Sequence, residues 1–169
     1  ELIKELVENK QLIIDAKKAE IKCSESVSLS VVKGEVVKSE GKGDSNKIYP
    51  VINTTNYMDS HGDVHAFGIW DKSLSEQSGN IHYVLDHELK VGSVVAYPSN
   101  VKPFVKTMLW SDLGVNLPGE TQALIYKVTL TGDEPQAFKN ALKHGSIENS
   151  VRMQYVKIEL AVNDDDYEE

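Results

Sequence analysis

Cysteine is almost absent from this chain, which has Cys23 as its single cysteine among 169 residues. One cysteine excludes an internal disulfide and any metal cage built from several thiolates. Cys23 stands in the segment Ile-Lys-Cys-Ser-Glu, without the basic or glycine-rich setting that activates a thiol. We therefore expect Cys23 to be passive.

Arginine is equally scarce, because Arg152 is the one arginine among 18 basic residues. With 26 acidic residues, the formal net charge is −8. Nucleic-acid binding requires a positive surface against the phosphates, so this charge predicts no nucleic-acid partner. The acidity gathers in residues 164–169, where we expect a solvated tail.

Long apolar runs are also missing. None approaches the ~20 residues that cross a bilayer, and the first residues do not have the pattern of a signal peptide. These absences predict no membrane partner and a location in a cytosol, or inside a particle assembled there. The rest of the composition, 40% hydrophobic and 26% charged, is ordinary for a folded domain with a sizeable core.

Apolar periodicity predicts a helix over residues 2–21, which either covers a core or pairs with a partner, and short helices over 70–77 and 134–144. Pro135 suits the first turn of the last of these helices. Alternating or continuous apolar runs predict strands over 27–37, 48–54, 80–86, 91–96, 101–109, 121–131 and 150–162.

This pattern of many strands and few helices predicts a mainly β fold with peripheral helices, of the α+β class. We divide the chain into an N-terminal amphipathic helix (1–24), a β domain (25–163) and an acidic tail (164–169). Pro50 favours an edge or strand-start position, because proline cannot donate to a strand ladder.

Two residues lie at strand ends, where a rigid scaffold commonly positions catalytic side chains. His87 ends the apolar run Val-Leu-Asp-His, and Ser150 begins a strand directly after a short helix. A nucleophilic serine needs a base within hydrogen-bond distance and donors for the oxyanion. Ser146 is a nearby alternative, although it fits better the C-terminal turn of the helix. Each of the two positions is common in proteins, and their combination carries the hypothesis.

Taken together, these segments resemble the prohead maturation proteases of tailed bacteriophages, which are related to herpesvirus assemblin. Three blocks carry the resemblance: residues 58–68, with Met-Asp-Ser-His-Gly-Asp-Val-His before Phe-Gly; residues 84–92, with Val-Leu-Asp-His before Val-Gly; and residues 145–153, with a glycine five residues before Ser150. Histidine comes first, serine follows 63 residues later, and a helix precedes the serine, as in the family.

The resemblance implies an assemblin-like, partly closed β-barrel and a serine endopeptidase with His87 and Ser150 as catalytic residues. The substrates would be capsid and scaffold proteins, and the protease itself, during prohead maturation in the host cytoplasm. It also implies self-association and requires no cofactor or metal. His87 would act as general base, and Arg152 would assist the oxyanion or form a salt bridge on the outer strand face.

One feature departs from the family, in which the third catalytic group is an acidic residue on a strand well downstream of the serine. Here the sequence continues for 19 residues after Ser150, into acidic residues. Either the chain is a truncated form or a present residue substitutes, for example Glu159 or a tail aspartate. Such a group orients the histidine, so its loss lowers the rate sharply.

Two alternatives remain open. If the segment holding Asp59, His61, Asp63 and His65 were extended, the four side chains would share one face and could bind zinc or manganese. Ser60 and Gly62 favour a turn instead, which would scatter them. The second alternative is an inactive scaffold or capsid-associated protein that keeps the protease fold.

Overall fold

The structure is a computed structural model that describes residues 2–25, 46–59, 61–144, 147–155 and 157–162. The chain divides into two compact units, one made of residues 1–23 with 152–169 and the other of Ser24–Val151. The second unit holds the central sheet, His87 and Ser150. The predicted strand at 27–37 lies outside the described residues.

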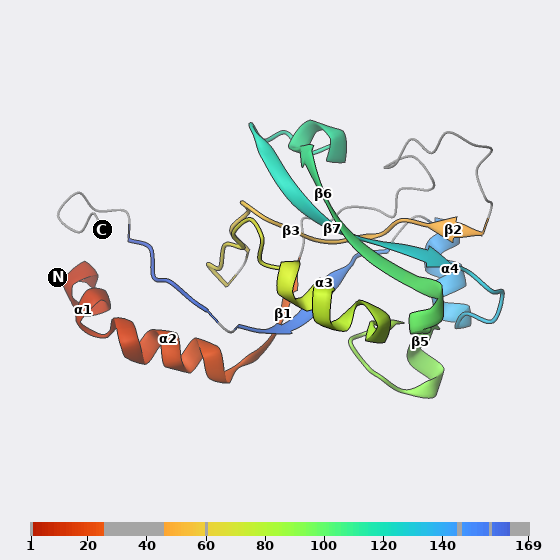
Figure 1. Cartoon of the computed structure of the whole chain (residues 1–169), viewed down its shortest axis with the longest axis horizontal. Coiled ribbons are helices and arrows are strands. Elements are labelled where there is room, and N and C mark those ends of the chain that lie inside the picture. Colours follow the sequence, from red (N-terminus) through yellow and green to blue (C-terminus); the bar gives the residue numbers. More distant parts are fainter. Residues whose placement is uncertain (1, 26–45, 60, 145–146, 156, 163–169) are drawn as a thin grey trace. The chain divides into compact units, whose positions relative to one another are not determined.

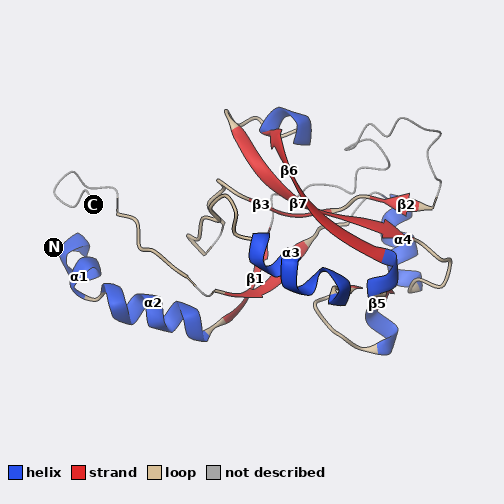
Figure 2. Ribbon diagram, viewed as in Figure 1, coloured by secondary structure: helices blue, strands red, loops and turns tan. Residues whose placement is uncertain are grey.

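The helices of the described residues are shown in Figures 1 and 2. The α-helices are α1 (Leu2–Glu8), α2 (Lys10–Ala19), α3 (Asp71–Gln77) and α4 (Gln136–His144). Four short 3-10 helices lie at Ser78–Asn80, Val91–Ser93, Pro98–Asn100 and Trp110–Leu113. The expected helix at 2–21 is therefore two helices, because Asn9 leaves helical geometry with φ −100° and ψ 10°. Among the described residues, none of the helices combines the length and the apolar character that a membrane-spanning segment requires.

The strands form three separate sheets in the described chain. They are β1 (Ile21–Glu25), β2 (Lys47–Ile48), β3 (Val51–Thr54), β4 (Tyr83–Val84), β5 (Val94–Ala96), β6 (Val101–Leu109), β7 (Glu120–Thr129) and β8 (Ser150–Gln154). Two of the sheets are two-stranded, β1 with β8 and β4 with β5, and the third surrounds β7.

Strand β7 is the centre of the main sheet. Along one edge β6 pairs with it antiparallel without a break, from Val101 opposite Val128 to Leu109 opposite Glu120. Along its other edge β2 and β3 follow one another, also antiparallel. Pro50 lies between β2 and β3, and its carbonyl accepts the N–H of Tyr126 at 3.1 Å. The expected strand at 48–54 is thus interrupted at the proline, yet it stays hydrogen-bonded to β7.

The two faces of β7 enter two apolar clusters, as the period-2 alternation of a strand requires. The larger cluster takes Leu124, Tyr126 and Val128 from β7 and continues through β4, β5, α3 and α4. The smaller cluster takes Ala123 and Ile125 and is closed by the turn at Trp110–Leu113. Both faces of β7 are therefore buried. The segments that carry His87 and Ser150 pack against the larger cluster.

The observed architecture is mixed α and β, about 35% helical and 29% strand. The expectation of a mainly β fold therefore overstated the strand content. The sheets are open, and no closed barrel occurs among the described residues. Three expected strands are shorter than predicted. The strand expected at 80–86 is reduced to β4, and the one expected at 91–96 is reduced to β5, which follows the 3-10 helix at Val91–Ser93. The strand expected at 150–162 is reduced to β8, which ends at Gln154. In contrast, β6 spans the predicted range 101–109.

Candidate active site

His87 lies in a tight turn at the end of β4. The N–H of Glu88 donates to the carbonyl of Leu85 at 3.0 Å and closes the turn. The two central residues, Asp86 and His87, have φ of 51° and 55°, which is the pattern of a type I′ turn. Side chains other than glycine pay about 1 kcal/mol or more for this left-handed geometry. The histidine is therefore held in an unfavourable backbone conformation that the surrounding structure must maintain.

Two neighbours hold this turn in place. The N–H of Leu85 donates to the carbonyl of Ser93 at 2.8 Å, which extends the pairing of β4 with β5 by one residue. The side chain of Leu85 packs against the larger apolar cluster. Asp86 remains exposed and His87 half-buried, so the imidazole lies where the apolar packing ends and solvent begins.

Ser150 is the first residue of β8. On either side of it, Ile147 and Val151 pack against the larger apolar cluster, while Asn149 is buried and Ser150 is half-buried. The serine backbone is therefore anchored through its neighbours, and its own side chain is left partly accessible. The predicted position of Ser150, at a strand start after a helix, agrees with the structure.

The structure brings these two residues together. His87 Nε2 and Ser150 Oγ lie 2.5 Å apart and form a short hydrogen bond between segments 63 residues apart in the sequence. This contact is slightly shorter than the roughly 2.6–3.2 Å usual for a nucleophile and its general base, so Oγ lies within reach for proton transfer to Nε2. We call this pair the dyad.

A third group is not evident near the dyad. Among the described residues, no hydrogen bond reaches Nδ1 of His87, the ring nitrogen that an orienting carboxylate would contact. Glu159 belongs to the other unit and forms an ion pair with Lys157 at 2.6 Å. That hydrogen bond and the lysine charge lower the pKa of Glu159. The tail aspartates lie outside the described residues, and Arg152 has an exposed side chain.

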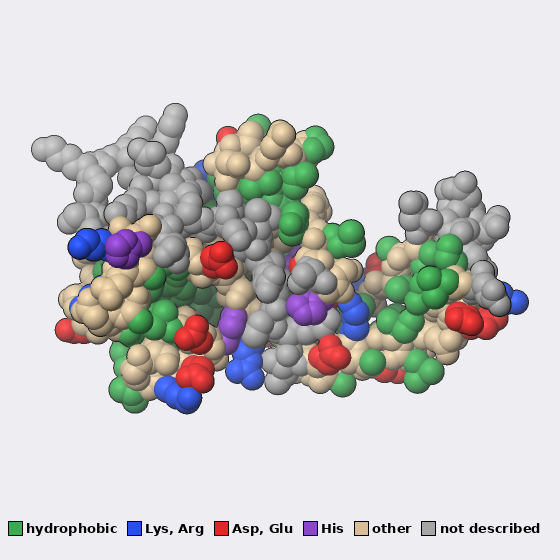
Figure 3. Space-filling model, turned by 180° about the vertical axis from the view of Figure 1, so that it is seen from behind, with side chains coloured by type: hydrophobic (Ala, Val, Ile, Leu, Met, Phe, Trp, Pro, Cys, Tyr) green, Lys and Arg blue, Asp and Glu red, His purple; other side chains and the backbone are tan. Residues whose placement is uncertain are grey.

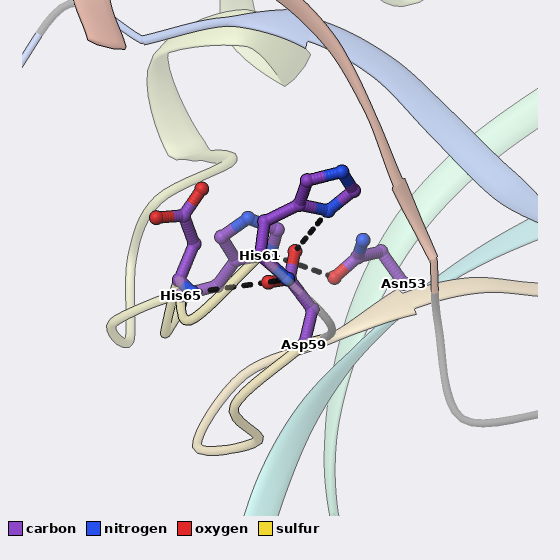
Figure 4. Close-up of polar contacts among 5 residues, drawn as sticks. Asn53, Asp59, His61 and His65 are labelled. Carbon is purple, nitrogen blue, oxygen red and sulfur yellow. Dashed lines mark hydrogen bonds and ion pairs between the residues drawn. The ribbon is translucent and has the colours of Figure 1, made fainter.

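The second set of candidate side chains lies in the loop that follows β3, shown in Figure 4. Asp59 Oδ1 accepts the backbone N–H groups of His61 at 2.9 Å and Asp63 at 3.0 Å. The N–H of Gly62, a residue with φ of +71°, donates to the carbonyl of Asp59 at 3.0 Å. These bonds define a turn closed by the Asp59 carboxylate, as Ser60 and Gly62 predicted.

His65 attaches this loop to the sheet. Its ring is buried, with Nδ1 2.8 Å from Oδ1 of Asn53 on β3. Its backbone carbonyl accepts the N–H of Asn56 at 2.9 Å. Burial lowers the pKa of His65 from its ordinary 6.5, although the nearby charges of Asp59 and Asp63 act in the opposite direction. The ring is therefore held neutral, as a hydrogen-bonding part of the core.

This arrangement does not support the metal-binding alternative. Within the described residues, no group of three or more His, Cys, Asp or Glu side chains could hold a metal ion. Asp59 directs its carboxylate to backbone N–H groups, while His61 is half exposed, with one ring nitrogen 4.0 Å from that carboxylate. The turn does not place the four side chains on one face as an extended backbone would: the Asp59 carboxylate accepts N–H groups of its own loop, while the His65 ring is buried beside Asn53.

On the face drawn in Figure 3, acidic and basic side chains are interspersed over the described part of the surface.

One pair of residues near the dyad was not anticipated from the sequence. The Tyr83 hydroxyl donates to Oδ1 of Asn149 at 2.6 Å in the protein interior. Each residue is close in sequence to one member of the dyad, but nothing in a single sequence indicates that a tyrosine and an asparagine 66 residues apart will meet.

Comparison with protein-family models, with curated proteins and with solved structures finds no match for this chain.

Proposed function

We propose that this protein is a serine endopeptidase of the prohead maturation type, which cleaves scaffold and capsid proteins and itself during assembly of a virus particle in the host cytoplasm. The observation that carries the proposal is the 2.5 Å contact between His87 Nε2 and Ser150 Oγ. The sequence resemblance points to the same two residues through their flanking patterns alone.

The chemistry is acyl transfer in two steps. In the first, His87 Nε2 takes the proton of Ser150 as Oγ bonds to the carbonyl carbon of a peptide, and the protonated ring then gives that proton to the leaving amine. In the second, His87 takes a proton from water, the resulting hydroxide attacks the acyl ester, and the proton returns to Ser150 Oγ as the carboxylic acid leaves. No cofactor or metal takes part.

The setting of the two residues supports these roles. Each side chain is half-buried and each is attached to the larger apolar cluster through its neighbours, so little motion is needed to reach a reactive geometry. The strained turn supports the same conclusion, because backbone strain clusters at functional sites. An assemblin-like architecture and self-association are part of the proposal by resemblance.

The direct test uses purified capsid and scaffold proteins as substrates for the full chain and for two variants, Ser150→Ala and Ser146→Ala. We expect cleaved products with the unchanged chain and with Ser146→Ala, and none with Ser150→Ala. Equal cleavage by Ser150→Ala would refute the nucleophile assignment. Loss of cleavage in Ser146→Ala alone would transfer the role to that serine.

A second candidate is an inactive scaffold or capsid-associated protein that retains the dyad. The observation in its favour is that Nδ1 of His87 has no hydrogen bond among the described residues, since an unoriented histidine is a weaker base. The same assay separates the two candidates. Binding to capsid or scaffold proteins without any cleavage would favour the inactive protein.

A further inference from the structure

The hydrogen bond between Tyr83 and Asn149 lies one step behind the dyad. Tyr83 is on β4, four residues before His87, and Asn149 is the residue directly before Ser150. The two contacts, Tyr83 to Asn149 at 2.6 Å and His87 to Ser150 at 2.5 Å, therefore join the same two segments of chain. Together with the backbone between them they form a closed ring of covalent and hydrogen bonds.

The Tyr83 side of this ring is firmly held. Its aromatic ring meets Phe138 on α4 edge-to-face, with centroids 5.9 Å apart, and Tyr126 on β7 with centroids 6.5 Å apart. Burial raises the pKa of the Tyr83 hydroxyl far above its ordinary value, so the group remains a donor. Tyr83 thus contacts the central strand and the helix that precedes the serine segment, and its hydroxyl bonds within that segment.

The remaining links of the ring are short and closed by hydrogen bonds. Between Tyr83 and the imidazole, the chain passes through the turn at residues 85–88, which backbone bonds fix at both Leu85 and Glu88. On the other side, a single peptide unit connects Asn149 to Ser150. Few rotatable bonds therefore separate the Tyr83–Asn149 hydrogen bond from the dyad, so a shift of Asn149 after loss of the Tyr83 hydroxyl should also displace Ser150.

We propose that Tyr83 is a positioning residue that acts through Asn149 to fix the separation of His87 Nε2 and Ser150 Oγ. The inference rests on the proposed function insofar as that separation governs proton transfer from the serine. Misplacement of reacting groups by about 1 Å can cost roughly 100-fold in rate. Loss of one hydroxyl that lies outside the reacting atoms should thus have a measurable effect on Ser150.

The test compares Tyr83→Phe with Tyr126→Phe in the full chain. Each variant removes one buried tyrosine hydroxyl and keeps the ring, but only Tyr83 bonds to Asn149. The readout is the rate at which a fluorophosphonate modifies Ser150, followed by intact mass. In that reaction Oγ bonds to phosphorus, fluoride leaves, and the hydroxyl proton passes to His87. Thermal unfolding of each variant is measured in parallel.

We expect Tyr83→Phe to slow the modification at least roughly tenfold at a temperature where the variant is folded, and Tyr126→Phe to change it less than about twofold. Equal rates in the two variants would overturn the inference. So would a Tyr83→Phe rate that recovers fully once corrected for its unfolded fraction, because the bond would then serve stability alone.

A second readout separates failure of this inference from failure of the proposed function. The ¹⁵N chemical shift of His87 Nε2 reports its hydrogen bond to Ser150 whether or not any bond is cleaved, and Ser150→Ala gives the shift without that bond. We expect Tyr83→Phe to move the signal toward the Ser150→Ala value, with Tyr126→Phe unchanged. If the unmodified chain is inert to the probe but this pattern holds, the proposed function fails while the positioning role stands. An unmoved signal in Tyr83→Phe refutes the positioning role.

Discussion

Two histidines of this chain make short side-chain hydrogen bonds in opposite settings. His65 is buried and bonds to an amide oxygen of Asn53, and its loop is fastened by the Asp59 carboxylate. His87 is half-buried at positive φ and bonds to the hydroxyl of Ser150. The first contact fastens a loop to the sheet, whereas the second accompanies a strained backbone and, in the proposed mechanism, would serve proton transfer. The comparison teaches that two side chains of the same type are given different hydrogen-bonding partners and exposure by their environment.

The largest expected effect is on the His87 side of this comparison. His87→Ala and His87→Gly both remove the imidazole, and we expect each to slow modification of Ser150 by roughly 1,000-fold, since general-base catalysis contributes 10²–10⁴-fold. Their stabilities should differ, because glycine adopts φ of 55° without the cost that alanine pays. We expect His87→Gly to be more stable than His87→Ala by about 1 kcal/mol in urea unfolding.

These two variants test separate parts of the comparison. Equal stability of the alanine and glycine variants would show that the turn is not strained in solution. Retention of Ser150 reactivity in both would remove His87 from the mechanism.

The next largest effect is on the stability contributed by His65. In His65→Leu the buried hydrogen bond to Asn53 is lost, and we expect the free energy of unfolding to fall by about 2–3 kcal/mol. The matched control is His61→Leu, since His61 is half exposed and should change stability by less than about 0.5 kcal/mol. Both variants should retain the Ser150 modification rate of the unchanged chain when folded. A selective loss of that rate in His65→Leu would give His65 a chemical role.

Parts of this contrast could be predicted from the sequence. The apolar residues of β6 and β7 and the proline that directly precedes α4 are local signals, and the helix and strands they predict are present. The order of His87 and Ser150 and their separation of 63 residues are also properties of the sequence, and they led to the prediction of this pair. Ser60 and Gly62 predicted a turn in place of an extended segment, and the Asp59 carboxylate closes that turn.

Other parts depend on contacts that no local signal reports. Within the predicted strands at 80–86 and 91–96 only Tyr83–Val84 and Val94–Ala96 form strand, because packing around Tyr83 and the turn at His87 overrides the apolar pattern of the other residues. The burial of His65 follows from its meeting with Asn53, 12 residues away, across a turn whose path is set by the sheet. The resemblance implies a partly closed barrel, whereas the sheets of the described residues are open, because closure depends on strand tilt and stagger that short motifs do not report.

A smaller effect is expected at Asp59, which holds the loop that carries His65. Asp59→Ala removes the acceptor of two backbone N–H groups, and we expect a loss of about 1–2 kcal/mol in the free energy of unfolding. Asp59→Asn keeps one side-chain oxygen and should lose less than half of that amount. If the two variants were equally destabilised, the carboxylate charge rather than turn closure would be its contribution.

The smallest effect, and the one that bears most directly on the comparison, is the pH dependence of stability due to His65. Burial lowers the pKa of this group below 6.5, and the charges of Asp59 and Asp63 offset part of the shift. Below pH 6.5 the unfolded chain therefore binds a proton that the folded chain does not, so stability falls as pH decreases through that window and is independent of His65 above it. His65→Gln, whose amide can still donate to Asn53, should reduce this slope in urea unfolding between pH 7 and pH 5. Parallel slopes for the unchanged chain and His65→Gln would mean that the folded chain protonates His65 as readily as the unfolded chain does. His65 would then not be a buried, neutral histidine, and its contrast with His87 would be lost.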